Sequence, residues 1–273
     1  CNNTAMPKSK IVPVVLILAA GSLWAANKFN PTCTLPSPLS QISKVHPVDK
    51  KCSADGKSKV AEKIAESRAK NNYCASGSTA PIVYDAFLEL QAAVEKDVQL
   101  GNGQRPPRPT KRYPTKSGTL GEGDKVRFAG WVLKATNSNT SNGENVNCKL
   151  TGVEANDIHV VLGRSPDDDE DASLTAEIIP HLRPLTWTKG NLMENKDRMF
   201  RFTGQLFLDS SHKVCPADDE DCHPKRASVW EIHPVYAIEV CKSKKPDKCD
   251  PSVNSHWTPL HKWVEQEEAG PDH

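Results

Sequence analysis

The sequence predicts a mainly β fold, on three observations. Several short stretches between Lys125 and Cys241 alternate apolar and polar residues, which is the period of a half-buried strand. The 273 residues include 21 prolines and six tryptophans, a composition that favours short strands joined by loops over a helical bundle. One helical stretch is inserted between the third and fourth of five strands, and this is the order of an OB barrel. We therefore predict a five-stranded OB-like β-barrel with an N-terminal helical, disulfide-pinned extension.

The predicted elements of the barrel follow one another closely. The strands lie in residues 125–135, 157–163, 174–179, 199–208 and 228–241. The short helix lies in residues 188–196, with Thr188 or Asn191 as its N-cap. Gly130 and Gly204 fall inside long strands, where a small closed barrel needs sharp bends.

The last predicted strand, Ser228–Cys241, has two different faces. Trp230 and Ile232 share the face expected to enter the core, and Glu231 and His233 share the opposite face. Pro234 cannot donate a backbone hydrogen bond to a neighbouring strand. We therefore expect either an edge strand or a bulge beside the histidine.

Residues 6–26 form a secretory signal pattern. The basic start Met6–Lys10 precedes the apolar run Ile11–Ala20, and the small residues between Gly21 and Ala26 place the expected cleavage there. Residues 1–5 lie upstream of the methionine that fits a start, so we expect them not to be native. The apolar run is short for a bilayer span, and an uncleaved anchor is the weaker alternative. We predict a periplasmic or secreted bacterial protein with no membrane span after cleavage.

The cysteine count agrees with export. Apart from Cys1 there are eight cysteines, and an even number in an exported chain favours disulfides, up to four of them. Proximity in sequence suggests a Cys52–Cys74 bridge and leaves the other pairings open. No two cysteines have the short spacing of a zinc site, so structural zinc is the weaker alternative. The eight are Cys33, Cys52, Cys74, Cys148, Cys215, Cys222, Cys241 and Cys249. Cys215 and Cys222 flank an acidic loop, and Cys241 and Cys249 flank a lysine-rich loop.

Composition divides the mature chain into four segments. They are an N-terminal helical region (27–100), a basic Pro-rich linker (101–118), the barrel domain (119–243) and a C-terminal tail (244–273). Helical spacing of apolar residues predicts helices over 57–71 and 84–98, the second packing on the sheet. The linker is a candidate polyanion-binding arm, although an extended, solvated strap across the barrel is the preferred interpretation.

Four segments resemble those of a group of uncharacterised exported bacterial proteins with an OB-like fold. They are Gly143–Cys148, Asn156–Leu162, Phe202–Asp209 and the strand Trp230–Val235, which reads Trp-Glu-Ile-His-Pro-Val. The likeness covers about residues 119–243. The resemblance implies the fold and export, and because that group has no assigned activity it implies no functional residue.

Carboxylates and imidazoles share faces of the predicted strands. Asp157 and His159 lie on one face of their strand, and Glu231 and His233 on one face of theirs. Such pairs bind a divalent metal or perform acid–base chemistry. The candidate binding or metal face is Asp157, His159, Glu177, Glu231 and His233, and the secondary candidates are Arg183, Arg201, Asp209 and His212.

The same pattern also fits a half-buried sheet whose outer face is simply polar. The sequence has no Gly-x-Ser-x-Gly, no His-Glu-x-x-His and no phosphate loop. The acidic run Asp167–Asp171 lacks the spacing of a calcium loop and fits a solvated turn better. No cofactor is certain from the sequence, and a divalent metal is the one candidate.

Two functions remain open on these observations. The first is an exported module that binds an oligosaccharide, an oligonucleotide or a protein through the barrel, and the lack of a catalytic motif favours it. The second is a metal-dependent hydrolase, phosphodiesterase- or nuclease-like, that uses the carboxylate and histidine face. A formal net charge of +1 gives no overall attraction to nucleic acid. Convergence of Asp157, His159, Glu177 and His233 is the geometric test, since scattered side chains would remove both site hypotheses.

Overall fold

A computed structural model of the chain describes residues 28–41, 46–103, 105–216 and 218–270. The predicted signal segment lies outside these residues. Within them, no helix is long and apolar enough to cross a membrane.

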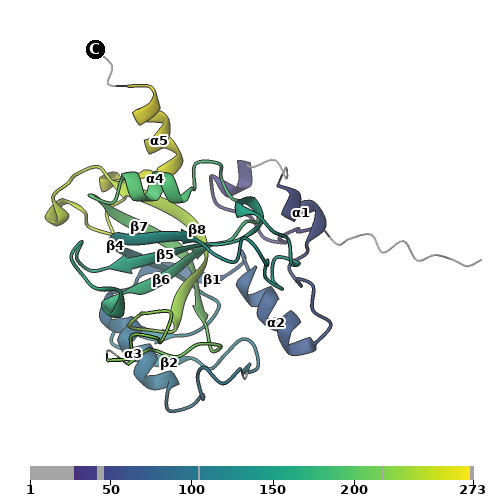
Figure 1. Ribbon diagram of the computed structural model, residues 1–273. Helices are drawn as coiled ribbons and strands as arrows, with labels where there is room; N and C mark the ends of the chain where they lie inside the picture. The colour runs from purple at the N-terminus through teal and green to yellow at the C-terminus, as the bar shows by residue number, and fades with distance from the viewer. Residues whose placement is uncertain (1–27, 42–45, 104, 217, 271–273) are drawn as a thin grey trace, which may run out of the picture.

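A five-stranded mixed barrel forms the centre of the molecule (Figure 1). Its strands are β4 (Asp124–Asn137), β5 (Ile158–Gly163), β6 (Leu174–Ile178), β7 (Met199–Leu208) and β8 (Trp230–Cys241). They pair in the order β4-β5-β6-β8-β7, and β7 also pairs with β4, which closes the barrel. The pairing of β6 with β8 is parallel and the others are antiparallel. The short helix α4 (Lys189–Glu194) joins β6 to β7, so the predicted OB-like fold is confirmed.

The alternating apolar residues of the strands fill the barrel. Phe128, Val160 and Ile232 are each at most 3% exposed and belong to one continuous core. The N-cap of α4 is Thr188, whose hydroxyl accepts a hydrogen bond from the Asn191 backbone N–H at 3.1 Å. The periodicity therefore identified both the inward face and the helix start.

Strand β8 is irregular beside Pro234. It has neighbours on both sides, β6 and β7, so the edge-strand alternative is wrong. Its register with β7 shifts on either side of Gly204, and the predicted bulge is present. A Cβ on Gly204 would lie 2.5 Å from Ile232 Cγ2 and 2.5 Å from the Pro234 carbonyl oxygen. Glycine is required here because the two backbones approach too closely for a side chain.

The N-terminal segment packs on the barrel. Its elements are α1 (Pro47–Lys51), α2 (Ala61–Lys70), β1 (Ser76–Pro81) and α3 (Tyr84–Val94). Strand β1 adds to the edge of β4 in parallel, a strand that the sequence analysis did not anticipate. The apolar stripe of α3 enters the barrel core as expected, and the Phe87 ring meets Phe128 edge to face at 5.8 Å.

Four disulfides join the eight cysteines. Cys215–Cys222 and Cys241–Cys249 close local loops, but the predicted Cys52–Cys74 bridge is wrong. Cys74 pairs with Cys33, and Cys52 pairs with Cys148, in both cases with a Cα–Cα distance of 5.6 Å. The segment after α1 lies against the turn 145–149, because the Lys57 backbone N–H donates to the Asn145 carbonyl oxygen at 2.9 Å. This contact brings Cys52 close to Cys148. Because all eight are paired, they are not zinc ligands.

The basic segment 101–118 is anchored on the barrel at a few residues, although most of its described residues are exposed. The Arg108 side chain is 5% exposed and forms an ion pair with Glu122. Strand β2 (Tyr113–Thr115) pairs with β3 (Gly118–Leu120), and the Tyr113 ring contacts Trp230 edge to face at 6.1 Å. These contacts fold the segment onto the barrel.

The C-terminal segment also packs on the barrel. Strand β9 (Trp257–Pro259) pairs with β8 and leads into α5 (Leu260–Glu268). Trp257 packs with the Cys241–Cys249 disulfide, and Trp263 donates to Asn195 Oδ1 at 2.8 Å. Short 3-10 turns complete the described elements at Leu39–Gln41, Val153–Ala155, Glu170–Ala172, Pro246–Lys248 and Asn254–His256.

Candidate functional site

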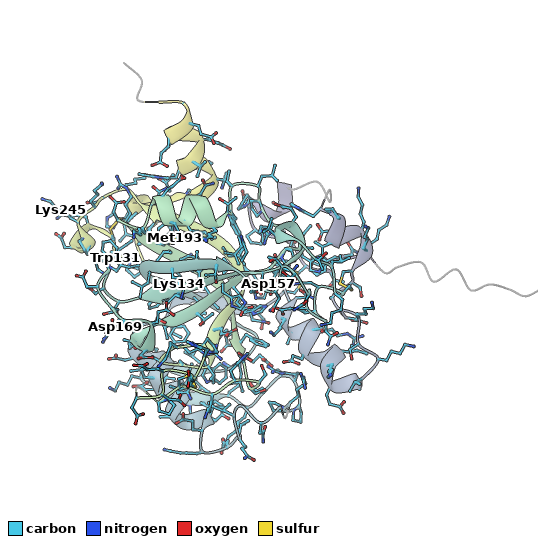
Figure 2. All side chains as sticks on the ribbon, viewed as in Figure 1. Trp131, Lys134, Asp157, Asp169, Met193 and Lys245 are labelled. Carbon is cyan, nitrogen blue, oxygen red and sulfur yellow. A yellow bond between two sulfur atoms is a disulfide. The ribbon has the colours of Figure 1, made fainter. Side chains whose placement is uncertain are left out.

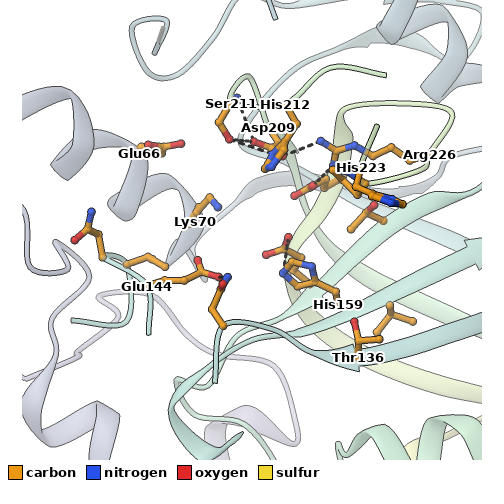
Figure 3. Close-up of a pocket in the computed structure, with 18 of the residues that line it drawn as sticks. Glu66, Lys70, Thr136, Glu144, His159, Asp209, Ser211, His212, His223 and Arg226 are labelled. Atoms are coloured by element: carbon orange, nitrogen blue, oxygen red, sulfur yellow. Dashed lines mark hydrogen bonds and ion pairs between the residues drawn. The ribbon is translucent and has the colours of Figure 1, made fainter. Parts of the chain in front are cut away.

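A cavity of about 810 Å³ lies between α2, the 139–149 turn and the polar faces of β5, β6 and β8 (Figure 3). Charged residues of both signs line it, among them Lys70, Arg105, Glu144, Lys225 and Arg226. Among the described residues that line it there is no phenylalanine, tyrosine or tryptophan. The lining is therefore suited to ions and acid–base chemistry rather than to stacking on rings.

Strand pairing places two histidines on either side of Glu177. His159 and Glu177 are direct partners of the antiparallel strands β5 and β6. Because β6 and β8 run in parallel with Thr175 opposite Glu231, Glu177 comes to lie beside His233. The Glu177 Oε1 atom is 3.2 Å from His159 Nε2, and the Oε2 atom is 2.9 Å from His233 Nδ1.

Asp157 lies directly before β5, on the His159 face. Figure 2 labels it at the end of the sheet, beside the N-terminal helices. The side chain is fully buried; Oδ1 accepts from Asn147 Nδ2 at 3.1 Å, and Oδ2 has no hydrogen-bond partner. Neither ring nitrogen of the buried His233 has a hydrogen-bond partner either. Buried polar atoms without partners are costly, so this pair of residues needs a physical explanation.

Two groups of side chains converge at distances that suit a metal ion. The first is Asp157, Glu177 and His233, and the second is Glu144, Asp157 and His159. Within each group, one ligand atom per residue lies within 4.8 Å of the others. Carboxylate oxygen and imidazole nitrogen are ligands for Zn²⁺, Mn²⁺ and related divalent ions. Asp157, Glu177 and His233 therefore converge in one group, and His159 meets Asp157 in the second group and Glu177 at 3.2 Å.

The ionisation of the buried groups follows from their contacts. Burial and the nearby Glu177 and Glu144 carboxylates raise the pKa of Asp157, and His233 and His159 oppose them, so that the pKa is about 6 overall. Burial also opposes ionisation of Glu177, but His159 and His233 outweigh it and lower the pKa of that carboxyl. The pKa of His233 is lowered by burial and raised more strongly by Glu177, to about 10 overall. Without a metal, a proton on His233 provides the counter-charge to Glu177.

The opposite wall of the cavity carries a charge network. Arg226 donates to Asp209 Oδ2 at 2.8 Å and also to Glu231 Oε1, and all three side chains are buried. His212 Nδ1 lies 2.5 Å from the same Asp209 oxygen, and this contact raises the pKa of the imidazole. The His212 side chain is 49% exposed, so its other nitrogen is available to a ligand in the cavity.

Lys70, the last residue of α2, points between these two walls (Figure 3). Burial lowers the pKa of its ammonium group, but Glu177, Asp209 and further carboxylates outweigh this effect and raise the pKa overall. Lys70 is therefore a permanent cation beside the converging carboxylates.

The structure separates the predicted site residues into two sets. All five residues of the candidate face lie at the cavity or directly beneath it, together with Asp209 and His212. Arg183 and Arg201 do not. Arg183 donates to the Asn156 and Val153 carbonyl oxygens, and Arg201 forms a two-point ion pair with Glu239. Both arginines stabilise local structure.

Lys70, Glu144 and Arg226 are among the cavity residues that were not predicted. They come from a helix end and two loops, where no period relates a side chain to the barrel. Glu144 lies in Gly143–Cys148, one of the four segments that resemble exported bacterial proteins. That likeness was the sequence signal that pointed to the 139–149 turn.

Comparison with known proteins gives no family. No family model and no curated protein matches the sequence. Among solved structures, the chain is similar to asparaginyl-tRNA synthetase of Entamoeba histolytica, one structure of which contains asparaginyl-adenylate. Both alignments have 15% identity and a TM-score of 0.26, over 49% of this chain and 24% of the synthetase chain. The chain thus spans about a quarter of the synthetase, and a likeness of this degree does not bear on function.

Proposed function

We propose that this protein is an exported, metal-dependent hydrolase of phosphodiesters. The observation that carries the proposal is the convergence of Asp157, Glu177 and His233 at the floor of a charged cavity, with Asp157 Oδ2 and both His233 nitrogens lacking hydrogen-bond partners. A divalent ion held there would satisfy Asp157 Oδ2 and one nitrogen of His233. Three protein ligands leave coordination positions for water and substrate, as in catalytic metal sites.

The chemistry of the proposal divides between the metal and the chain. A bound divalent ion lowers the pKa of its water and polarises a phosphoryl oxygen. His212, oriented by the buried Asp209 and open to the cavity, supports proton transfer to a leaving oxygen. Lys70 and Arg105 place positive charge where the phosphate would enter.

The phosphodiester class follows from the lining. OB barrels commonly hold sugars and bases on aromatic platforms, and the described lining residues include no phenylalanine, tyrosine or tryptophan, so recognition of the phosphodiester itself is favoured over recognition of sugars or bases. Cations and oriented imidazoles instead match an anionic ester. Export is supported by the four disulfides, which are typical of proteins that fold in an oxidising compartment.

A second candidate is the binding of an anionic ligand without turnover. The cations around the cavity favour it, because Lys70, Lys134 and Lys225 would hold a phosphate group in the absence of any metal. Calorimetric titration of the EDTA-treated protein with a non-hydrolysable phosphodiester separates the two candidates. Binding of equal strength with and without metal, together with no cleavage, would favour this function.

The first prediction tests the hydrolase directly. The purified protein is expected to cleave bis(p-nitrophenyl) phosphate and single-stranded DNA or RNA with Mg²⁺, Mn²⁺, Ca²⁺ or Zn²⁺, and EDTA is expected to stop it. His159→Gln removes a partly exposed ligand and should lower kcat/KM by about 100-fold or more. His256→Gln, outside the cavity, is the matched control and should retain activity. If no metal raises the melting temperature and no substrate is cleaved, the hydrolase is excluded.

A further inference from the structure

We infer that the site is built for two divalent ions, bridged by the carboxylates of Asp157 and Glu177. This inference rests on the proposed metal-dependent function and specifies its metal content. The deep position is formed by Asp157, Glu177 and His233, and the outer position by Glu144, Asp157 and His159.

Glu177 has the geometry of a bridging ligand. Its two oxygens face two different imidazoles, Oε1 facing His159 at 3.2 Å and Oε2 facing His233 at 2.9 Å. Ligands at right angles around an ion, each about 2.1 Å away, are about 3.0 Å apart. The separations of 3.2 Å and 2.9 Å therefore fit one ion on each side of the carboxylate, with Glu177 joining the outer group through Oε1 as well as the deep group through Oε2.

Two carboxylates face the same nitrogen of His233. Glu177 Oε2 lies 2.9 Å from His233 Nδ1, and Glu231 Oε2 lies 3.5 Å from it. The metal-free imidazole carries a proton between these carboxylates, and a divalent ion at the deep position would take the place of that proton.

Asp157 is the second bridge, since it belongs to both groups of converging side chains. Its Oδ2 atom lacks a partner although the residue is 0% exposed, which points to a ligand independently of the acidic cluster itself. Asn147 holds the other oxygen at 3.1 Å and fixes the orientation of the carboxylate. Oriented ligands of this kind are typical of metal centres.

The ligand set carries enough negative charge for more than one ion. Glu144, Asp157 and Glu177 contribute three negative charges and the two histidines none when they act as ligands. With two divalent ions the ligand set would carry one positive charge and the Lys70 ammonium a second, which would attract an entering phosphodiester anion. Two ions also bind the attacking and the leaving oxygen at once in phosphoester hydrolysis.

The two positions differ in exposure. The deep ion would be enclosed, because the His233 side chain is 0% and the Glu177 side chain 7% exposed. The outer ion would face the cavity, because the His159 side chain is 36% exposed and Glu144 is half-buried. We therefore expect the deep position to fill first and the outer ion to exchange readily with solvent.

The test counts ions in the full mature chain. Metal-free protein is titrated with Mn²⁺, followed by calorimetry and by electron paramagnetic resonance, and bound metal is measured after desalting. Two ions per chain and a spin-coupled signal are expected. Glu144→Gln keeps the size of the side chain and should reduce the content to one ion and abolish the coupling. Glu154→Gln, whose side chain is 67% exposed and lies outside the cavity, is the control and should retain two ions.

The outcomes separate this inference from the proposed function. One ion per chain with metal-dependent cleavage retains the hydrolase and overturns the two-ion site. Two ions bound to Glu144→Gln would also overturn the two-ion site as described, because the outer ion would then not depend on the Glu144 carboxylate. No bound metal overturns both.

Discussion

Lys70 is the residue whose charge competes with a metal. It points between Glu144 and Asp209, and its ammonium group is stabilised by the same carboxylates that would bind the ions. Two like charges about 4 Å apart repel by about 1 kcal/mol in water and by about 4 kcal/mol near a protein surface. In the proposed site Lys70 would therefore have two opposing effects, since its charge would weaken metal binding and attract an anionic substrate.

The prediction from this competition concerns Lys70→Met. The variant should bind Mn²⁺ at least about tenfold more tightly, equivalent to about 1.4 kcal/mol, and should show a higher KM for phosphodiesters. Lys70→Arg keeps the charge and serves as the control. Calorimetry and steady-state kinetics on the same preparations measure both effects. Unchanged metal affinity in Lys70→Met would mean that its charge does not reach the ions.

At the scale of elements, three strands place the face of the site. His159 is on β5, Glu177 on β6 and His233 on β8, and the OB order puts β6 between the other two. The bulge at Pro234 falls directly after His233 and opposite Gly204. The geometry of β8 therefore depends on a residue of β7 that does not itself line the cavity.

Gly204→Ala tests this dependence. The added Cβ would lie 2.5 Å from atoms of Ile232 and Pro234, so β8 must move. We expect a loss of about 1–3 kcal/mol of unfolding free energy, together with weaker metal binding. Gly190→Ala in α4, where the nearest atom is 3.6 Å away, is the control and should be neutral or stabilising. Thermal unfolding and metal titration provide the two measurements, and equal melting temperatures would contradict the prediction.

The barrel and its polar face could be predicted because they depend on local periods. Alternation in β5 and β8 put His159 and His233 on polar faces, and the strand order made those faces neighbours. Lys70, Glu144 and Arg226 could not be found in this way. Their positions depend on loops, on the packing of α2 and on the Cys52–Cys148 bridge, which sequence proximity assigned wrongly.

At the scale of the whole molecule, the site joins two parts of the chain. The barrel provides Asp157, His159, Glu177 and His233, and the 139–149 turn that carries Glu144 is tied to the N-terminal segment by Cys52–Cys148. This disulfide spans 96 residues in sequence, whereas Cys241–Cys249 spans eight. Longer loops lose more chain entropy when they close, so the first bridge should stabilise more.

The matching prediction compares two double variants. Replacing Cys52 and Cys148 with serine should lower the unfolding free energy by about 4–5 kcal/mol, against about 2–3 kcal/mol for Cys241 and Cys249. The first pair should also weaken binding of the outer ion, because the turn that carries Glu144 loses its attachment. Denaturant unfolding and Mn²⁺ titration measure the two effects. Equal metal affinity in both double variants would show that the bridge does not position Glu144.

The described lining of the cavity has no phenylalanine, tyrosine or tryptophan, and this has a consequence for selectivity. Bases are distinguished by stacking and by hydrogen bonds to their edges, whereas lysine, arginine and metal ions contact phosphate oxygens that are the same at every nucleotide. A cavity of this composition recognises the backbone of a polymer and the spacing of its charges. The proposed hydrolase would therefore cleave such a polymer without regard to base sequence.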